Sequence, residues 1–177
     1  MENDVKDIAT NRFLSLEQGK NRLRIVGGSE DRFGCYLAWH RSEEGNKPFR
    51  TMDYADAYDY DTDNKPKKIW VVLAWNYATE QIEIWEIPQK SIIEALRSLV
   101  ASADWGDLTN YDIEVSKTGQ KLDTRYTVMP QPVKSLTAEI KTEVKDHGID
   151  IKALLTGGDP FAPAVSVGEM DAAIGGL

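Results

Sequence analysis

The chain has 177 residues, a net charge of −8 and 41% hydrophobic residues. This length suits one domain with a hydrophobic core, and no apolar run is long enough to span a membrane. A single cysteine, Cys35, excludes an intrachain disulfide and therefore a small secreted disulfide scaffold, while the N-terminus lacks the order of a signal peptide. We expect a cytoplasmic protein without a membrane partner.

Two strands are predicted after a polar N-terminal arm, which covers residues 1–12. The first runs from about residue 21 to 26, where alternation turns Arg22 and Arg24 outward and their apolar neighbours inward. The second is the stretch RFGCYLAWHR at 32–41, which places aromatic and apolar residues on one side. Both strands are therefore expected to contribute one face to a core.

The stretch from residue 42 to 65 is polar and has no period, which predicts an irregular excursion. Residues 51–64 contain five aspartates and no lysine or arginine. Asp59, Asp61 and Asp63 match the first three ligand positions of an EF-hand calcium loop. The glycine required at the sixth position and the glutamate required at the twelfth are missing, which excludes that site. The segment 53–63 is either a solvated acidic loop or a functional one, in which Tyr54, Tyr58 and Tyr60 give stacking faces or the aspartates repel a polyanion and act as a lid.

Residues 67–88, KKIWVVLAWNYATEQIEIWEIP, contain three of the five tryptophans and predict a β-hairpin, because β-branched and aromatic residues suit a pleated surface. Alternation places Lys68 and Trp70 on one face of the first strand, and Trp85 on the polar-flanked face of the second. This aromatic face is either a second buried face or a platform for a flat ligand. Its pairing of a cation with an indole favours neither alternative by itself.

A change of period follows the hairpin. Residues 89–103 carry apolar side chains at helical spacing and predict an amphipathic helix. Two alternating segments, 111–119 and 122–130, predict a further pair of strands, which prolines at 130 and 132 then end. The remainder predicts a helical segment at 135–156 and a flexible tail at 157–177.

If the two segments before the Trp hairpin share the first strand position and the hairpin supplies the second and third, the predicted order is three strands, one helix and two strands, which is that of an OB fold. We therefore expect a mainly β, α+β protein: a five-stranded OB-like barrel over residues 13–134, with its helix between the third and fourth strands, followed by C-terminal helices and a tail. In such a barrel one face of each strand fills the interior, and the other presents a groove.

Several stretches also resemble the single-stranded DNA-binding proteins of tailed bacteriophages. The resemblance is carried in order by FLSLEQGKNRLRIVGG, the Trp hairpin with its helix, DWGDLTNYDIEVSKTG and LDTRYTVMPQP, which together span residues 13–132. It implies an OB fold and binding of single-stranded DNA without strong sequence preference during phage DNA replication or recombination, in the host cell cytoplasm. The zinc-containing relatives need a Cys/His cluster that this chain lacks.

Aromatic faces that stack on bases, and cations that neutralise phosphates, are the side chains such binding requires. The predicted nucleic-acid-binding residues are Arg22, Arg24, Trp39, Arg41, Lys47, Arg50, Lys68, Trp70, Tyr77, Trp85, Lys117, Lys121 and Arg125. Trp70 and Arg125 are the leading candidates, because each shares its strand face with polar residues.

Other functions find less support in the sequence. No catalytic or phosphate-binding motif is present, and Cys35, His40 and His147 are too scattered for a zinc site, so we expect no enzyme, no metal and no cofactor. The acidic C-terminal part is expected to contact replication or recombination proteins, and GGDPF at 157–161 is either such a peptide or a turn that packs Phe161 on the domain. The alternative function is an OB-like interaction or homo-oligomerisation module without DNA binding, because Trp, Tyr and Arg are also enriched at interfaces.

Overall fold

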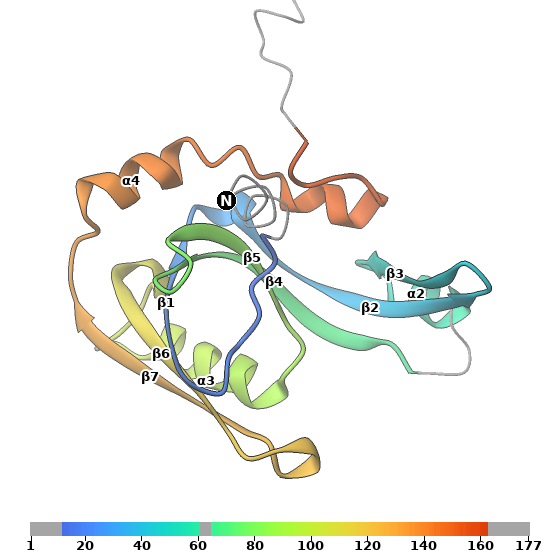
Figure 1. The fold of residues 1–177 in the computed structure, drawn as a ribbon, viewed down its shortest axis with the longest axis horizontal. Helices are drawn as coiled ribbons and strands as arrows, with labels where there is room; N and C mark the ends of the chain where they lie inside the picture. Colours follow the sequence, from blue (N-terminus) through green and yellow to red (C-terminus); the bar gives the residue numbers. More distant parts are fainter. Residues whose placement is uncertain (1–11, 61–64, 163–177) are drawn as a thin grey trace, which may run out of the picture.

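The computed structural model describes residues 12–60 and 65–162, apart from the side chains of 40–42 and 59–60. These residues form an α+β fold with a mainly antiparallel sheet and a few short helices (Figure 1). The strands are β1 (Gly19–Val26), β2 (Arg32–Ser42), β3 (Gly45–Thr51), β4 (Lys67–Asn76), β5 (Gln81–Ile87), β6 (Tyr111–Thr118) and β7 (Arg125–Val133). The α-helices are α2 (Tyr54–Tyr60), α3 (Lys90–Ala101) and α4 (Ala138–Lys145), and the 3-10 helices are η1 (Ser29–Asp31), η2 (Leu108–Asn110), η3 (Lys121–Asp123) and η4 (Ile151–Thr156).

The sheet has the order β3-β2-β4-β1-β6-β7, and β5 pairs with the other edge of β4. β1 and β2 share one edge of β4, since Val26 pairs with Leu73 and Arg32 pairs with the next residue, Val72. The two strands therefore follow β4 as one long strand with an interruption. At that interruption Gly27 has φ +90°, and a Cβ there would collide with the Asp31 side chain.

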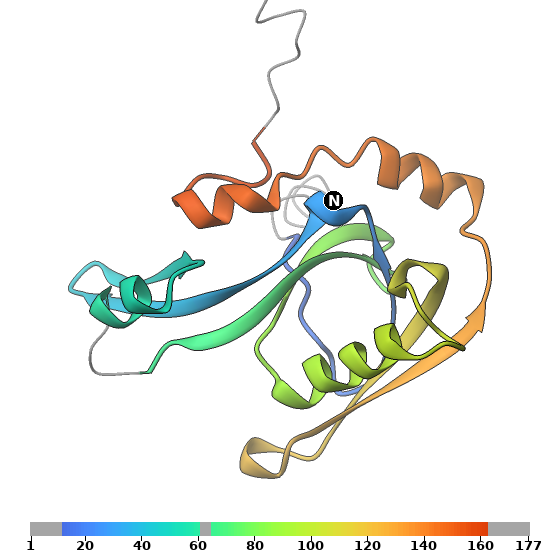
Figure 2. The same cartoon turned by 180° about the vertical axis from the view of Figure 1, so that it is seen from behind.

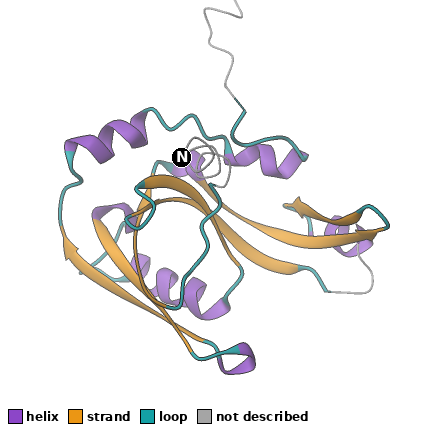
Figure 3. Ribbon diagram, in the orientation of Figure 1, coloured by secondary structure: helices purple, strands orange, loops and turns teal. Residues whose placement is uncertain are grey.

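Beyond the interruption, β2 carries the chain away from the rest of the sheet. β2 and β3 form a hairpin whose one face is covered by α2, and these elements project together (Figure 3). We call residues 36–60 the wing. The predicted irregular excursion at 42–65 was therefore wrong for its described part, because the strand β3 and the helix α2 lie within it.

The sheet is not closed into a barrel, so the predicted five-stranded barrel was wrong in that respect. Among the described strands no ladder joins β5 to β7. The free edge of β5 is instead occupied by the N-terminal segment: Leu14 N–H donates to Ile84 O at 2.8 Å, and Ile84 N–H donates to Arg12 O at 2.8 Å. A strand has only two edges, and those of β5 are used by β4 and by residues 12–14.

Both faces of the β4–β5 hairpin are buried. Val72, Trp85 and Ile87 pack with α3 in one cluster, whereas Val71, Leu73 and Ile84 pack under the C-terminal segment in another. Figures 1 and 2 show α3 and the C-terminal segment on opposite sides of these strands. On the aromatic face Trp85 is buried in this core, whereas Trp70 is partly exposed at the edge of it.

The predicted helix after the hairpin is confirmed as α3, with Ile92, Ile93 and Leu96 buried. The helical segment predicted at 135–156 contains α4 and η4. The segment expected to be a tail from residue 157 packs on the domain as far as the structure describes it: the rings of Phe161 and Phe13 meet edge to face at 5.5 Å between centroids. No described helix is long and apolar enough to cross a membrane.

Candidate nucleic-acid interface

A crevice of about 390 Å³ lies between the β2–β4 ladder and α3. Trp70 of β4 forms one wall and is partly exposed. Its partner across the ladder is Gly34, where an added Cβ would stand 3.7 Å from the indole Cδ1 atom. The lining consists of Ile25, Arg32, Phe33, Gly34, Trp70, Val72, Val100 and Leu108. The missing side chain at Gly34 thus leaves open space beside the indole ring.

Three cations surround this crevice. The guanidinium carbon of Arg97, on α3, lies 5.6 Å from the centroid of the Trp70 ring, within the range of a cation–π contact. Arg32 lines the crevice and donates hydrogen bonds to Gly27 O and Gly28 O, at 3.1 and 3.3 Å, which fix its side chain. Lys68 is exposed and lies on the same face of β4 as Trp70.

The same face continues onto the wing. Tyr36 pairs with Lys68 across the β2–β4 ladder, and its ring meets Tyr54 edge to face at 5.3 Å. Tyr54 in turn stacks on Tyr58 at 6.3 Å, and both rings are exposed. We call these four side chains, Trp70, Tyr36, Tyr54 and Tyr58, the aromatic strip. Tyr54 and Tyr58 of the acidic segment 53–63 are therefore exposed, which fits a solvated loop as well as stacking faces, and the side chain of Tyr60 lies outside the described part.

Two predicted site residues are buried and were wrong as outward groups. Arg24 is 2% exposed, because its guanidinium is drawn inward to the Asp112 carboxylate and to two backbone carbonyls. Trp85 is 1% exposed, because its face of β5 packs against α3 in the core. Neither side chain can contact a ligand in this structure.

The remaining predicted residues fall into separate regions. Lys68 and Trp70 lie together at the crevice, whereas Trp39 is exposed on the opposite face of β2. The Arg50 guanidinium donates two hydrogen bonds, of 2.7 and 2.8 Å, to the Glu86 carboxylate. The Lys47 Nζ atom lies 3.8 Å from Glu44 Oε2. The side chain of Arg41 lies outside the described part.

Lys117, Lys121 and Arg125 lie at or near the β6–β7 hairpin tip, away from the crevice lining. Lys121 and Arg125 are exposed, and Arg125 donates to the backbone oxygens of Leu122 and Thr124. Of the two leading candidates, Trp70 lines the crevice and Arg125 does not. The hairpin tip itself is well exposed, since Leu122 projects from it.

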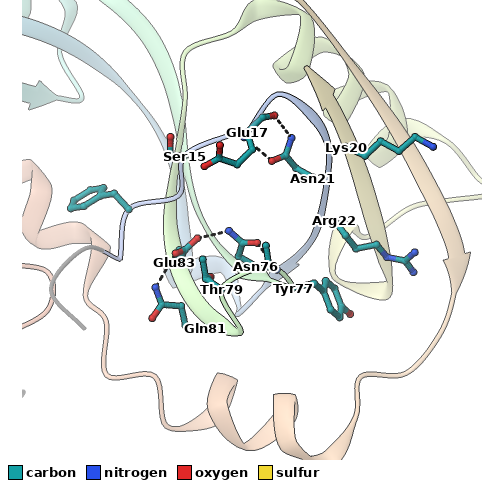
Figure 4. A pocket seen from close by; sticks show the side chains of 12 residues that line it. Ser15, Glu17, Lys20, Asn21, Arg22, Asn76, Tyr77, Thr79, Gln81 and Glu83 are labelled. Carbon is teal, nitrogen blue, oxygen red and sulfur yellow. Dashed lines mark hydrogen bonds between the residues drawn. The ribbon is translucent and has the colours of Figure 1, made fainter. Parts of the chain in front are cut away.

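Arg22 and Tyr77 form a second group on the other side of β1. Both line a cavity of about 740 Å³ between the N-terminal segment and the β4–β5 turn (Figure 4). The Arg22 guanidinium carbon lies 5.9 Å from the Tyr77 ring centroid. Burial raises the pKa of Tyr77 to about 12, together with its hydrogen bond to Asp112, so the phenol remains a donor at neutral pH.

Residues that sequence reasoning missed complete both regions. Arg97 and Gly34 shape the space around Trp70, and Asp112 organises the cations near Tyr77. The sequence signal for Arg97 was its place on the predicted amphipathic helix, one turn after the buried Ile93. No local pattern distinguishes Asp112 from an ordinary outward charge on a strand.

No group of three or more potential metal-ligating side chains occurs among the described residues. Neither a scan against protein-family models nor a search of curated proteins matches this sequence. The geometry of the described residues therefore carries the functional argument.

Proposed function

We propose that this protein binds single-stranded DNA without strong sequence preference, and that it coats exposed strands during phage DNA replication or recombination without acting as an enzyme. The observation that carries this proposal is the Trp70 crevice, in which a partly exposed indole has open space at Gly34 and a guanidinium over its ring. A base enters that space and stacks on the indole. The flanking Arg32, Lys68 and Arg97 pair with phosphates.

The energetics favour this use of the crevice. Stacking of a base on an aromatic side chain contributes about 1–3 kcal/mol and tolerates any base, because every base has a π-face. Cations next to the ring add salt-dependent phosphate contacts. The aromatic strip offers further rings, Tyr36, Tyr54 and Tyr58, along the wing for successive bases. A local group of cations lets a chain of net charge −8 attract DNA at this face.

The connectivity supports an open variant of the OB arrangement. β1 with β2 acts as one long first strand, β4 and β5 follow, α3 comes next, and β6 and β7 complete the order. The wing is then an enlarged connection between the first and second strands. OB proteins use that connection and the second strand to hold oligonucleotides, which agrees with the location of the aromatic strip.

The test is a titration of fluorescently labelled oligo-dT followed by anisotropy at several salt concentrations, with duplex DNA as a control ligand. We expect saturable binding that favours the single strand. A plot of log binding constant against log salt concentration should have a slope of about −0.7 per phosphate contact. Trp70→Leu should weaken binding by roughly 5- to 150-fold, the equivalent of one lost stacking contact. Trp39→Leu is the matched control, because Trp39 is exposed on the opposite face.

Two results would contradict the proposal. Wild-type protein that stays folded and shows no binding at low salt would exclude it. Equal losses for Trp70→Leu and Trp39→Leu would remove the crevice as the binding site.

A second candidate function is an interaction or oligomerisation module. The observation that favours it is the exposure of Met52, Tyr54 and Tyr58 together on the wing. Light scattering separates the two functions, because it measures the mass of the particle in solution. An oligomer that dissociates in Tyr58→Ser, and whose mass does not change when oligo-dT is added, would favour the module.

A further inference from the structure

The Asp112 carboxylate is fully buried and binds three cations. Its Oδ2 atom accepts from Arg22 Nε and Nη2 at 3.1 and 2.9 Å and lies 3.3 Å from Lys134 Nζ. Its Oδ1 atom accepts from Arg24 Nη1 at 3.0 Å and from the Tyr77 hydroxyl at 2.9 Å. One negative charge therefore faces three positive charges, which leaves an excess of positive charge on this side of β1.

The three cations do not have the same role. Arg24 is buried and also donates to Thr109 O and Lys134 O, at 2.9 and 2.8 Å, so it ties β1 to the segments before β6 and after β7. Arg22 and Lys134 have side chains that are 41% and 52% exposed. They share the Oδ2 atom of Asp112, so their charges lie close together at the surface. Asp112 joins these two cations, and its single negative charge does not neutralise both of them.

Room for a ligand adjoins Arg22. Arg22 and Tyr77 line the 740 Å³ cavity and point to the same side in Figure 4. Lys20 also lines that cavity, but its ammonium lies 3.7 Å from Glu114, the register partner of Arg22. The half-exposed cations at this place are Arg22, which lines the cavity together with Glu17, and Lys134, which shares the Asp112 carboxylate with Arg22 outside the lining. Glu83, another lining residue, is buried and already accepts from Asn76 and Gln81.

This charge lies next to the Trp70 crevice across one short element. Leu108 of η2 lines the crevice. The following residues of η2 face the cation group, since Thr109 O accepts from Arg24 and Asn110 O accepts from the Lys134 backbone. η2 therefore lies between the crevice lining and the segments that carry Arg24 and Lys134.

We propose that Arg22 and Lys134 form a phosphate-binding site for the backbone of the DNA strand whose base stacks on Trp70, with Asp112 as the positioning residue. The proposal rests on the proposed function, and it extends the bound strand from the wing across η2 to the outer face of β1. Asp112 holds both cations in place without cancelling their combined charge. Tyr77 and the buried Arg24 complete its hydrogen bonds.

The first arm of the test compares wild type with Arg22→Gln/Lys134→Gln on oligo-dT of about 16 nucleotides, the upper range for one OB domain. Loss of two phosphate contacts should lower the log–log salt slope by about 1.4, and Lys134→Gln alone by about 0.7. Lys141→Gln/Lys152→Gln removes the same charge from exposed positions elsewhere and should leave the slope unchanged. A slope equal to that of wild type in both cation variants overturns the proposal.

The second arm uses inorganic tripolyphosphate and needs no DNA. At low salt it should raise the melting temperature of wild type and of the Lys141/Lys152 control, and raise that of the Arg22/Lys134 variant much less. The single Lys134→Gln variant serves if the double variant does not fold. Wild type that fails to bind DNA but is stabilised by tripolyphosphate would exclude the proposed function while keeping the phosphate site. No stabilisation of wild type excludes the site.

Discussion

Arg24 and Asp112 form a buried ion pair, with 3.0 Å between Nη1 and Oδ1 and both side chains almost fully inaccessible. Removal of one partner of such a pair leaves an uncompensated buried charge, which costs about 3–5 kcal/mol. We therefore expect Asp112→Asn to lower the free energy of unfolding by an amount in this range. Urea denaturation followed by circular dichroism measures it. A loss below about 1 kcal/mol would show that water or another acceptor replaces the carboxylate.

Acid should weaken the fold through the same carboxylate. Burial disfavours the charged form of Asp112, but hydrogen bonds from Tyr77, Arg22 and Arg24 outweigh it and hold the pKa below the ordinary 3.8. A lowered pKa gives stability that is present above pH 3.8 and is lost as pH falls through the folded-state value. Denaturation curves across this range should show the loss in wild type and a smaller one in Asp112→Asn. If the free energy of unfolding fell equally with pH in wild type and in Asp112→Asn, the loss of stability would come from other groups.

The thiol of Cys35 should be unreactive in the native protein. Burial raises its pKa to about 11, Glu86 adds to the effect, and Arg50 opposes it. The reactive thiolate is therefore scarce at neutral pH, and the side chain is also inaccessible. We expect iodoacetamide to alkylate Cys35 slowly in the folded protein and rapidly in urea, as mass spectrometry would follow. Rapid native alkylation would mean that β2 opens frequently at this point.

Filling the space beside Trp70 should impair binding without unfolding the protein. A Cβ at Gly34 would make only an ordinary contact with the indole, whereas a longer side chain would occupy the crevice. Gly34→Leu should weaken oligo-dT binding by roughly 5- to 150-fold, like the loss of one stacked base. Gly34→Ala is the matched control and should bind nearly as wild type does. Binding of Gly34→Leu at wild-type strength would locate the base elsewhere.

Local periodicity was sufficient for most of the fold. Helical spacing identified α3, because it matches the burial of that helix, whereas β-branched and aromatic residues identified the Trp hairpin, both of whose faces are buried. Closure of the sheet was not predictable in this way. It depends on residues 12–14, which occupy the edge of β5 from 70 positions away in the chain. β3 and α2 were missed because their exposed, polar residues give no burial period.

The site was predictable only where a residue's own strand determined its exposure. Trp70 and Lys68 lie together at the crevice, as their shared strand face required. Arg24 and Arg22 occupy equivalent positions by alternation, yet Arg24 is buried because Thr109, Asp112 and Lys134 come from distant segments to meet it. The contact of Arg97 with Trp70 likewise depends on how α3 packs under the sheet.

The contact between Phe13 and Phe161 joins segments from near the two ends of the chain at the edge of β5. During synthesis the N-terminal segment reaches its place on β5 before its aromatic partner has been made. Until about residue 161 has left the ribosome, Phe13 therefore has no Phe161 ring to pack against. The Arg12 guanidinium likewise lacks the Phe161 ring face over which it lies in the folded protein. A nascent chain halted after β7 would thus keep an apolar face of its β4–β5 hairpin uncovered, and exposed apolar surface of this kind favours aggregation.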